Sequence, residues 1–201
     1  GMEAWVRREI AIQIALLQDK SFFVGTGTAG APRGVFLHPS IQSETCVSAG
    51  IDTTAELWNV LVNFVKKSRD KFSLGLSGLG WAAAPGVLYH LAKVKDTTGR
   101  PIFESLTQGS FSTAGAPSTV LRYPILDSAQ LSTGTTTTER LMFGPWGDGV
   151  IAEWGTIELA MSEQTESNFR KGRATVRGIG EYDCGFFHAD AFVQAGSAVG
   201  T

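Results

Sequence analysis

The stretch Arg173-Ala-Thr-Val-Arg-Gly-Ile-Gly-Glu-Tyr-Asp-Cys-Gly-Phe-Phe187 changes character at every second residue. One set of alternate positions is small or apolar: Ala174, Val176, Gly178, Gly180, Tyr182, Cys184 and Phe186. The other set holds Thr175, Arg177, Glu181 and Asp183, with Ile179 as the exception. Successive side chains of a strand point to opposite faces. The pattern therefore predicts one unusually long strand with one wet face, bent where its glycines lie.

Helices are predicted at three places outside this strand. Residues 2–18 contain no Gly or Pro, and their apolar side chains cover a broad face. A second helix is expected to begin at Thr53, whose spacing to Glu56 fits a capping box, and to end near Arg69 or Asp70. A short third helix is expected from Pro85, a residue suited to the first helical turn, to about Val94.

Further strands are predicted between and after these helices. The expected strands are Val35–Leu37, Cys46–Ser48, Leu79–Ala84, Val120–Leu126, Leu141–Gly147, Val150–Met161 and His188–Gln194. Pro124 indicates that its strand lies at an edge or bends. Residues 96–101 are expected to form a turn, and 105–118 and 132–138 to form loops. The 24 glycines and the short Ser/Thr/Gly stretches indicate many turns and loops, and hence a sheet-rich or mixed protein.

Composition limits the classes of function. Charged residues make up 18% of the 201 residues, which is below the usual quarter. Basic residues number 17 and acidic residues 19, giving a net charge of −2. The basic residues are spread thinly, without the basic face of a sequence-specific nucleic-acid-binding protein. The apolar residues indicate either a larger core or an apolar surface meant for partners.

The loop with Gly25, Gly27 and Gly30 matches the spacing of a dinucleotide-binding loop. Such a loop needs a strand before it and a helix after it, so that N–H groups at the helix start face the pyrophosphate. Here a predicted helix precedes the loop, and residues 31–34 do not begin an amphipathic helix. A flexible connector is the better interpretation.

No other group of residues predicts chemistry. The histidines, His38, His90 and His188, are isolated, and Glu158, Glu163 and Glu166 are interpreted as strand-edge and loop charges. Cys46 and Cys184 lack metal-ligand spacing and are predicted to be buried free thiols. We therefore predict no catalytic, cofactor-binding or metal-ligating residue, and no cofactor. The longest apolar run near the N-terminus, Ile14–Leu17, is too short to cross a bilayer, and no signal peptide is expected.

One ordered set of motifs carries a family resemblance. The set comprises Leu91, Asp96, Gly99 and Arg100 at the end of the short helix, then Tyr123-Pro124-Ile125, Phe143-Gly144 and Asn168-Phe169. In this order the chain, from about residue 5 to 195, resembles the major capsid proteins of tailed bacteriophages with the Hong Kong 97 fold. That family has Leu-x-Asp-x-x-Gly-Arg, Gly-x-Pro-Val and Phe-Gly-Asp patterns. This chain departs from them in a longer Leu91-to-Asp96 gap and in Pro145 and Trp146, which precede Asp148.

The resemblance implies an α+β fold with two interleaved domains. Residues 2–39 would form the C-terminal half of the spine helix and a connector of the peripheral domain, and 40–153 the axial domain. Residues 154–195 would return to the peripheral domain as its strands, and 196–201 would form a flexible tail. The family's N-terminal arm and extended hairpin loop have no counterpart here. Together with the uncapped first helix, this leads us to expect an N-terminally truncated chain. Gly172 stands where some members have a crosslinking asparagine, so no isopeptide crosslink is expected.

The resemblance also implies a function. The chain would be a structural subunit, not an enzyme, that assembles with itself into pentamers and hexamers of an icosahedral phage or prophage capsid. Scaffold, protease and portal proteins would be further partners, packaged DNA would be contacted only non-specifically, and no membrane would be involved. The protein would lie in the bacterial host cytoplasm before assembly and in the virion afterwards. One alternative is the shell of a cellular nanocompartment with the same fold. Another is a small-molecule or nucleotide-binding enzyme that uses the Gly25–Gly30 loop.

Overall fold

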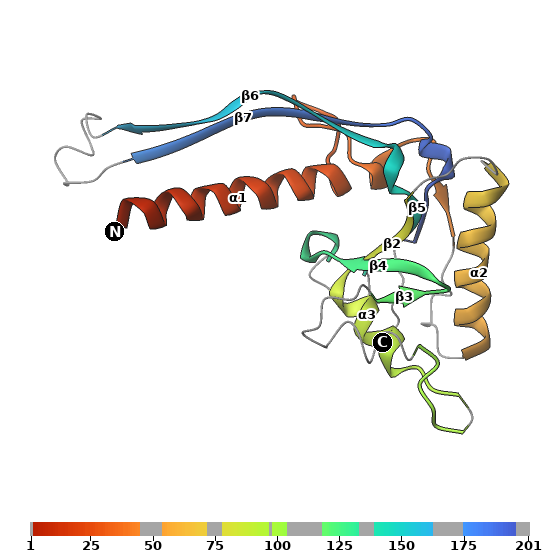
Figure 1. Cartoon of the computed structure of the whole chain (residues 1–201). Coiled ribbons are helices and arrows are strands. Elements are labelled where there is room, and N and C mark those ends of the chain that lie inside the picture. The colour runs from red at the N-terminus through yellow and green to blue at the C-terminus, as the bar shows by residue number, and fades with distance from the viewer. Residues whose placement is uncertain are drawn as a thin grey trace.

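The computed structural model describes residues 2–44, 54–71, 78–96, 98–103, 118–132, 139–162 and 175–195. Two parts can be distinguished in Figure 1. The body is built on a six-stranded sheet with two helices. The extension consists of helix α1 (Met2–Val24) and a two-stranded ribbon of β6 (Gly149–Ser162) and β7 (Thr175–Phe186), which run beside each other away from the body.

The body sheet is mixed. Its strands are β1 (Gln42–Ser43), β2 (Leu79–Ala83), β3 (Thr119–Val120), β4 (Tyr123–Asp127), β5 (Leu141–Pro145) and β8 (Val193–Ala195), in the order β1-β8-β5-β2-β4-β3. The β2–β5, β5–β8 and β3–β4 pairs are antiparallel, while β2–β4 and β1–β8 are parallel. A parallel pair needs a long crossover connection, and the chain between β2 and β4 contains helix α3 (Pro85–Lys93).

Aromatic rings form the centre of the body. Trp81 lies 4.5 Å from Phe143 and 5.6 Å from Phe64, measured between ring centroids. Phe64 belongs to helix α2 (Thr54–Lys71), whose residues Leu57, Val60 and Leu61 are also buried. Their three- and four-residue spacing places them on one helix face, so the stripe predicted from the sequence is the face that packs on the sheet.

The extension joins the body at the C-terminal end of α1. Phe23 packs edge-to-face on Trp146, with centroids 5.9 Å apart, and Phe22 contacts Phe186 at 5.1 Å. The ribbon pairs antiparallel from Gly149↔Phe186 to Ser162↔Thr175, with an irregularity between Trp154 and Glu158. Since, in the part of the chain that the structure describes, β6 and β7 pair with no other strand, α1 is their main additional support there.

Most predicted elements are confirmed, with small shifts at their ends. The second and third helices, and the strands predicted at 79–84, 141–147, 150–161 and 173–187, match α2, α3, β2, β5, β6 and β7. Helix α1 extends past the predicted end at Gln18 to Val24. The reason is that no helix breaker occurs before Gly25 and that the last turn is held by the packing of Phe22 and Phe23.

Two short strand predictions were wrong, one entirely and one in part. Val35–Leu37 forms a 3-10 helix (η1) instead of a strand. His188–Gln194 is divided, because Ala189–Ala191 forms a 3-10 turn (η5) and only Val193–Ala195 pairs, as β8. That strand joins β5 and β1 in the body, not the ribbon.

The run Val120–Leu126 is not one strand. A two-residue turn at Leu121-Arg122 separates β3 from β4, and both residues have positive φ, 51° and 69°. Each such residue, when it is not Gly, costs on the order of 1–3 kcal/mol. Strand β4, which contains Pro124, is also not an edge strand, because it pairs with β2 as well as with β3.

Several predictions lie outside the described residues. They concern the Thr53–Glu56 capping box, Cys46–Ser48, most of the 105–118 and 132–138 loops, Glu163, Glu166, Asn168-Phe169, Gly172 and the tail at 196–201.

Candidate functional site

The Gly25–Gly30 loop closes on itself. The Gly27 N–H donates to the Pro32 carbonyl at 3.1 Å, and the Gly34 N–H donates to the Gly25 carbonyl at 2.9 Å. A Cβ at Gly25 would overlap the Pro32 carbonyl. The loop leads into the short 3-10 helix η1, so it offers no helix N-terminus to a phosphate. It acts as a compact connector, more ordered than the flexible one predicted.

The Asp96–Arg100 motif is explained by a turn. The Asp96 carboxylate accepts hydrogen bonds from the Thr98 N–H at 2.8 Å, the Thr98 hydroxyl at 2.6 Å and the Arg100 N–H at 3.0 Å. Gly99 has φ of 83°, a conformation in which Gly carries no steric penalty. The hydrogen bond from the Thr98 side chain, followed by that from the Arg100 backbone, lowers the pKa of Asp96. The motif therefore builds a turn and presents no reactive group.

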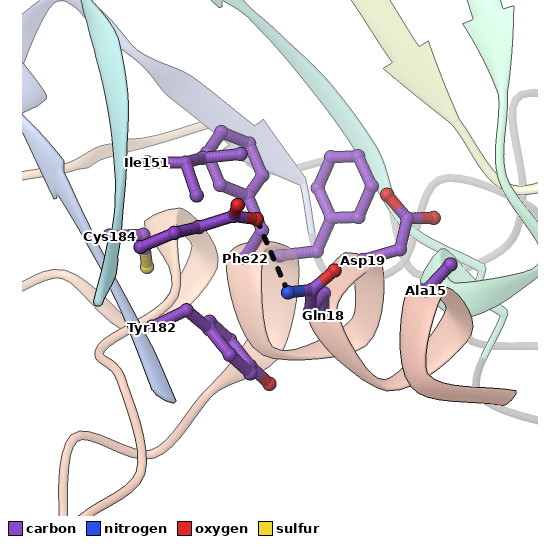
Figure 2. A pocket seen from close by; sticks show the side chains of 9 residues that line it. Ala15, Gln18, Asp19, Phe22, Ile151, Tyr182 and Cys184 are labelled. Atoms are coloured by element: carbon purple, nitrogen blue, oxygen red, sulfur yellow. Dashed lines mark hydrogen bonds between the residues drawn. The ribbon is translucent and has the colours of Figure 1, made fainter. Parts of the chain in front are cut away.

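A cleft of about 300 Å³ lies between α1 and the ribbon. Figure 2 shows that α1 contributes Gln18, Asp19 and Phe22, and that Ile151, Tyr182 and Cys184 come from the ribbon. Gln18 Nε2 donates to Glu153 Oε1 at 3.4 Å, and the Tyr182 hydroxyl donates to Ser21 Oγ at 3.0 Å. These bonds join α1 to the ribbon, so the residues around the cleft mainly hold the two elements together. We call this contact between α1 and the ribbon the seam.

The thiol in this seam is not activated. Burial raises the pKa of Cys184, and the Asp183 carboxylate raises it further. The neutral thiol, which is a poor nucleophile, donates weakly to the Arg33 carbonyl at 3.4 Å. Cys184 is free, as predicted, but it is only partly buried. It therefore has neither the low pKa nor the exposure of a reactive cysteine.

The histidines do not form a site together. His188 Nδ1 lies 2.8 Å from Asp148 Oδ2, where the ribbon leaves the body. His90 on α3 is partly buried, and His38 Nδ1 accepts from the Ser40 N–H. Across the described residues, no group of three or more His, Cys, Asp or Glu could hold a metal ion. Over the same part of the chain, no helix has the length and apolar character needed to span a membrane.

The surface feature that remains is a set of exposed apolar side chains on the extension. They are Trp5, Ile12, Leu16 and Leu17 on α1 and Val150, Ile151, Trp154 and Ile179 on the ribbon, with Phe187 directly after β7. The side chains of Trp5 and Trp154 are 64% and 59% exposed. Exposed apolar side chains of this size are candidates for contact with a partner, and the body also exposes Leu37, Trp58, Val62, Tyr89 and Leu126. The sequence does not identify these residues as exposed, because periodicity shows which residues share a face but not whether that face is covered.

Two sequence comparisons agree with this picture. The model of the Phage capsid family matches residues 1–195. The major capsid protein of Klebsiella oxytoca phage phiKO2 is 24% identical over 209 aligned positions, which cover 96% of this chain. The chain spans about half the length of that relative, 46%.

Solved structures share the fold at low sequence identity. The capsid of an empty GTA particle matches with a TM-score of 0.71 at 16% identity, over 96% of this chain and 65% of that one. The Gordonia phage Cozz structure gives 0.65 at 18% identity, over 96% and 62%. The SrpI encapsulin of Synechococcus elongatus PCC 7942 gives 0.60 at 13% identity, over 100% and 66%. The predicted α+β fold of the Hong Kong 97 type is thus confirmed, and the chain belongs to the Phage capsid family.

Proposed function

We propose that this chain is a structural shell subunit, part of the major capsid protein of an icosahedral phage or prophage that assembles into pentamers and hexamers around DNA. The observation that carries the proposal is the extension, whose two layers leave apolar side chains such as Trp5 and Trp154 exposed. Two-stranded ribbons are marginally stable in water. Copies that cover each other's extensions would therefore gain stability by assembling.

The proposed mechanism is geometric. Closed rings reuse one pair of complementary surfaces head-to-tail, and the low charge content of this chain suits interfaces whose centres are depleted of charge. The interleaved assignment of axial residues 40–153 and peripheral residues 2–39 and 154–195 belongs to this proposal, except that β8 (Val193–Ala195) pairs within the body sheet. The proposal also includes scaffold, protease and portal proteins as partners and non-specific contact with packaged DNA. It places the protein in the host cytoplasm before assembly and in the virion afterwards.

No enzymatic activity is part of the proposal. The pKa of Cys184 is raised by burial, the glycine loop is closed by its own hydrogen bonds, and Asp96 is engaged in a turn. Each of these groups has a structural explanation. A thermal-shift screen with nucleotides tests the enzyme alternative, which a reproducible shift abolished by Gly27→Asp would support.

The main test is expression of the full-length gene with its neighbouring genes, followed by negative-stain electron microscopy. Closed particles are expected. The variant Trp154→Ser is expected to reduce particle yield strongly while changing the free energy of unfolding by less than about 0.5 kcal/mol, as is usual for surface positions. The matched control is Trp58→Ser on α2, a 46% exposed tryptophan of the body, which is expected to reduce the yield less. Absence of particles under all conditions would contradict the proposal.

The nanocompartment alternative has one observation in its favour, the likeness of the fold to an encapsulin. The match to the phage family model over residues 1–195 favours the capsid. Purified particles distinguish the two, because a capsid encloses nucleic acid that is protected from nuclease, whereas a nanocompartment would enclose protein.

A further inference from the structure

The ribbon has one face that α1 covers and one that it leaves open. On β7, Tyr182 and Cys184 point into the seam, and α1 runs along this side of the ribbon (Figure 1). Successive side chains of a strand alternate between its faces, so the odd-numbered residues of β7 point away from α1. Every odd-numbered residue from 175 to 185 is exposed. We call this side of the ribbon the outer face.

The centre of the outer face has a self-complementary sequence. In Arg177-Gly-Ile-Gly-Glu181, an apolar residue lies midway between a cation and a carboxylate. A two-fold axis at Ile179 reverses the strand direction, so Ile179 meets itself and Arg177 of each copy meets Glu181 of the other. Within the described residues neither Arg177 nor Glu181 forms an ion pair. Both charges are therefore open to a second copy, and their spacing matches it.

The match includes strand β6. Across the ribbon, Trp154 pairs with Glu181 and Ala160 pairs with Arg177. An axis that crosses both strands at the level of Ile179 therefore lays Trp154 of one copy over Ala160 of the other, a large side chain opposite a small one. It also brings Arg177 of one copy beside the exposed Trp154 ring of the other, where a cation and an aromatic face attract each other.

We propose that two copies of this chain bind each other through their outer faces, as an antiparallel pair of ribbons with Ile179 on the two-fold axis. The inference deepens the proposed shell function and rests on it for its place in the shell, because icosahedral shells contain pairs of subunits related by two-fold axes. Stacked sheets keep their strand directions within about 30° of each other. The contact removes Trp154 and Ile179 of both copies from water.

Other arrangements fit the outer face less well. An axis at Gly180 would place Ile179 against Glu181 of the second copy, where the carboxylate would lose water without gaining a partner. A nucleic-acid phosphate would be repelled, because binding to nucleic acid depends on basic groups. The acidic residues of the described outer face, Glu158, Glu181 and Asp183, outnumber Arg177.

The proposed pair contains one unfavourable contact. Glu158 pairs with Ile179 across the ribbon, so it lies near Glu158 of the second copy at the axis. Like charges opposite each other weaken an association. Glu158→Gln removes this repulsion and is expected to lower the dissociation constant of the pair about threefold.

The main test is a charge exchange, with the dissociation constant of the purified chain measured by sedimentation equilibrium. Arg177→Glu and Glu181→Arg are each expected to raise it at least about tenfold, because both symmetry-related contacts become like-charge contacts. The double variant restores both pairs with their signs exchanged. It is expected to return the dissociation constant to within about threefold of the wild type.

Arg100→Glu is the matched control, since it makes the same charge change at an exposed arginine of the body. It is expected to leave the dissociation constant unchanged. The melting temperatures of all these variants are expected to agree within about 2 °C, because the substituted residues are exposed. A change in association therefore reports on the contact and not on folding.

Two results would overturn the inference. One is a wild-type chain that stays monomeric up to about 1 mM, and the other is a double variant that associates as weakly as the single variants. Particle formation by the full-length protein separates this inference from the shell function. If Arg177→Glu forms particles as the wild type does, the inference is wrong while the shell function stands. Rescue by charge exchange in a protein that forms no particles would support the contact and remove the shell function.

Discussion

The body and the extension both contain tryptophan and other large apolar residues, but they bury these side chains to different extents. In the body, Trp81, Phe64 and Phe143 are almost completely buried between the sheet and α2. In the extension, Trp5 and Trp154 remain largely exposed, because one helix and one two-stranded ribbon cannot enclose a core. The body thus encloses a core of its own, although Leu126, Tyr89 and Trp58 on its surface are also exposed, whereas the extension depends on additional surface to cover its apolar side chains. A shell subunit needs both properties, one for folding and the other for association.

The strongest test of this contrast is Trp81→Ala. Removing a buried aromatic ring costs about 3–5 kcal/mol, and this variant also leaves the Val120 carbonyl without its indole donor. Urea unfolding followed by circular dichroism measures the change. A cost below about 1 kcal/mol would show that the body is not the stabilising unit.

A matched pair of glycine substitutions gives the next largest effect. A Cβ at Gly144 on β5 would overlap the Phe192 ring, while a Cβ at Gly185 on β7 would meet no atom within 4 Å. Gly144→Ala is expected to destabilise by about 1–3 kcal/mol, the usual result of overpacking. Gly185→Ala is expected to stay within about 0.5 kcal/mol. Equal effects, measured by thermal unfolding, would contradict the difference in packing between the two parts.

Tyr182→Phe tests the seam between α1 and the ribbon. It removes the hydroxyl that donates to Ser21 Oγ, with an expected loss of about 0.5–1.5 kcal/mol. The loss should appear locally, as faster hydrogen exchange of the ribbon amides, and not in the body. Tyr89→Phe on α3 is the control, because Tyr89 is exposed. Unchanged ribbon exchange would show that the hydroxyl does not hold the seam.

The smallest expected effect is a pH dependence confined to the Asp96 turn. Hydrogen bonds from Thr98 and then Arg100 lower the pKa of Asp96 below its ordinary value of 3.8. A lowered folded-state pKa contributes stability above the unfolded-state value, and this contribution is lost as the pH falls through the folded-state value. The protection of the Thr98 and Arg100 amides, measured as their exchange rates relative to those of an unstructured chain at the same pH, is therefore expected to fall below about pH 4. Asp96→Asn should remove this dependence and Asp127→Asn should not.

Prediction succeeded where the signal is local. The stripe of Leu57, Leu61 and Phe64, the Pro85 start of α3 and the alternation at 173–187 each depend on residues close in sequence. The division of Val120–Leu126 could not be predicted, because Leu-Arg is not a typical turn pair. The strained turn is held by Trp81 and Arg69, both far away in the chain. An apolar surface for partners was one of two interpretations of the composition, but which residues form it on the extension could not be predicted, since exposure depends on what lies opposite a face.

The sequence by itself determined the helices, the strands β2, β5, β6 and β7, the low charge content and the family resemblance, because these follow from periodicity, composition and ordered motifs. Only the tertiary structure decided that β8 pairs with β5 and β1 in the body sheet, while β6 and β7 stand apart with α1. The physical reason is that strand pairing and burial are contacts between distant segments. A residue's own neighbours in the sequence fix its local conformation and its face, but they do not determine which surface will cover that face.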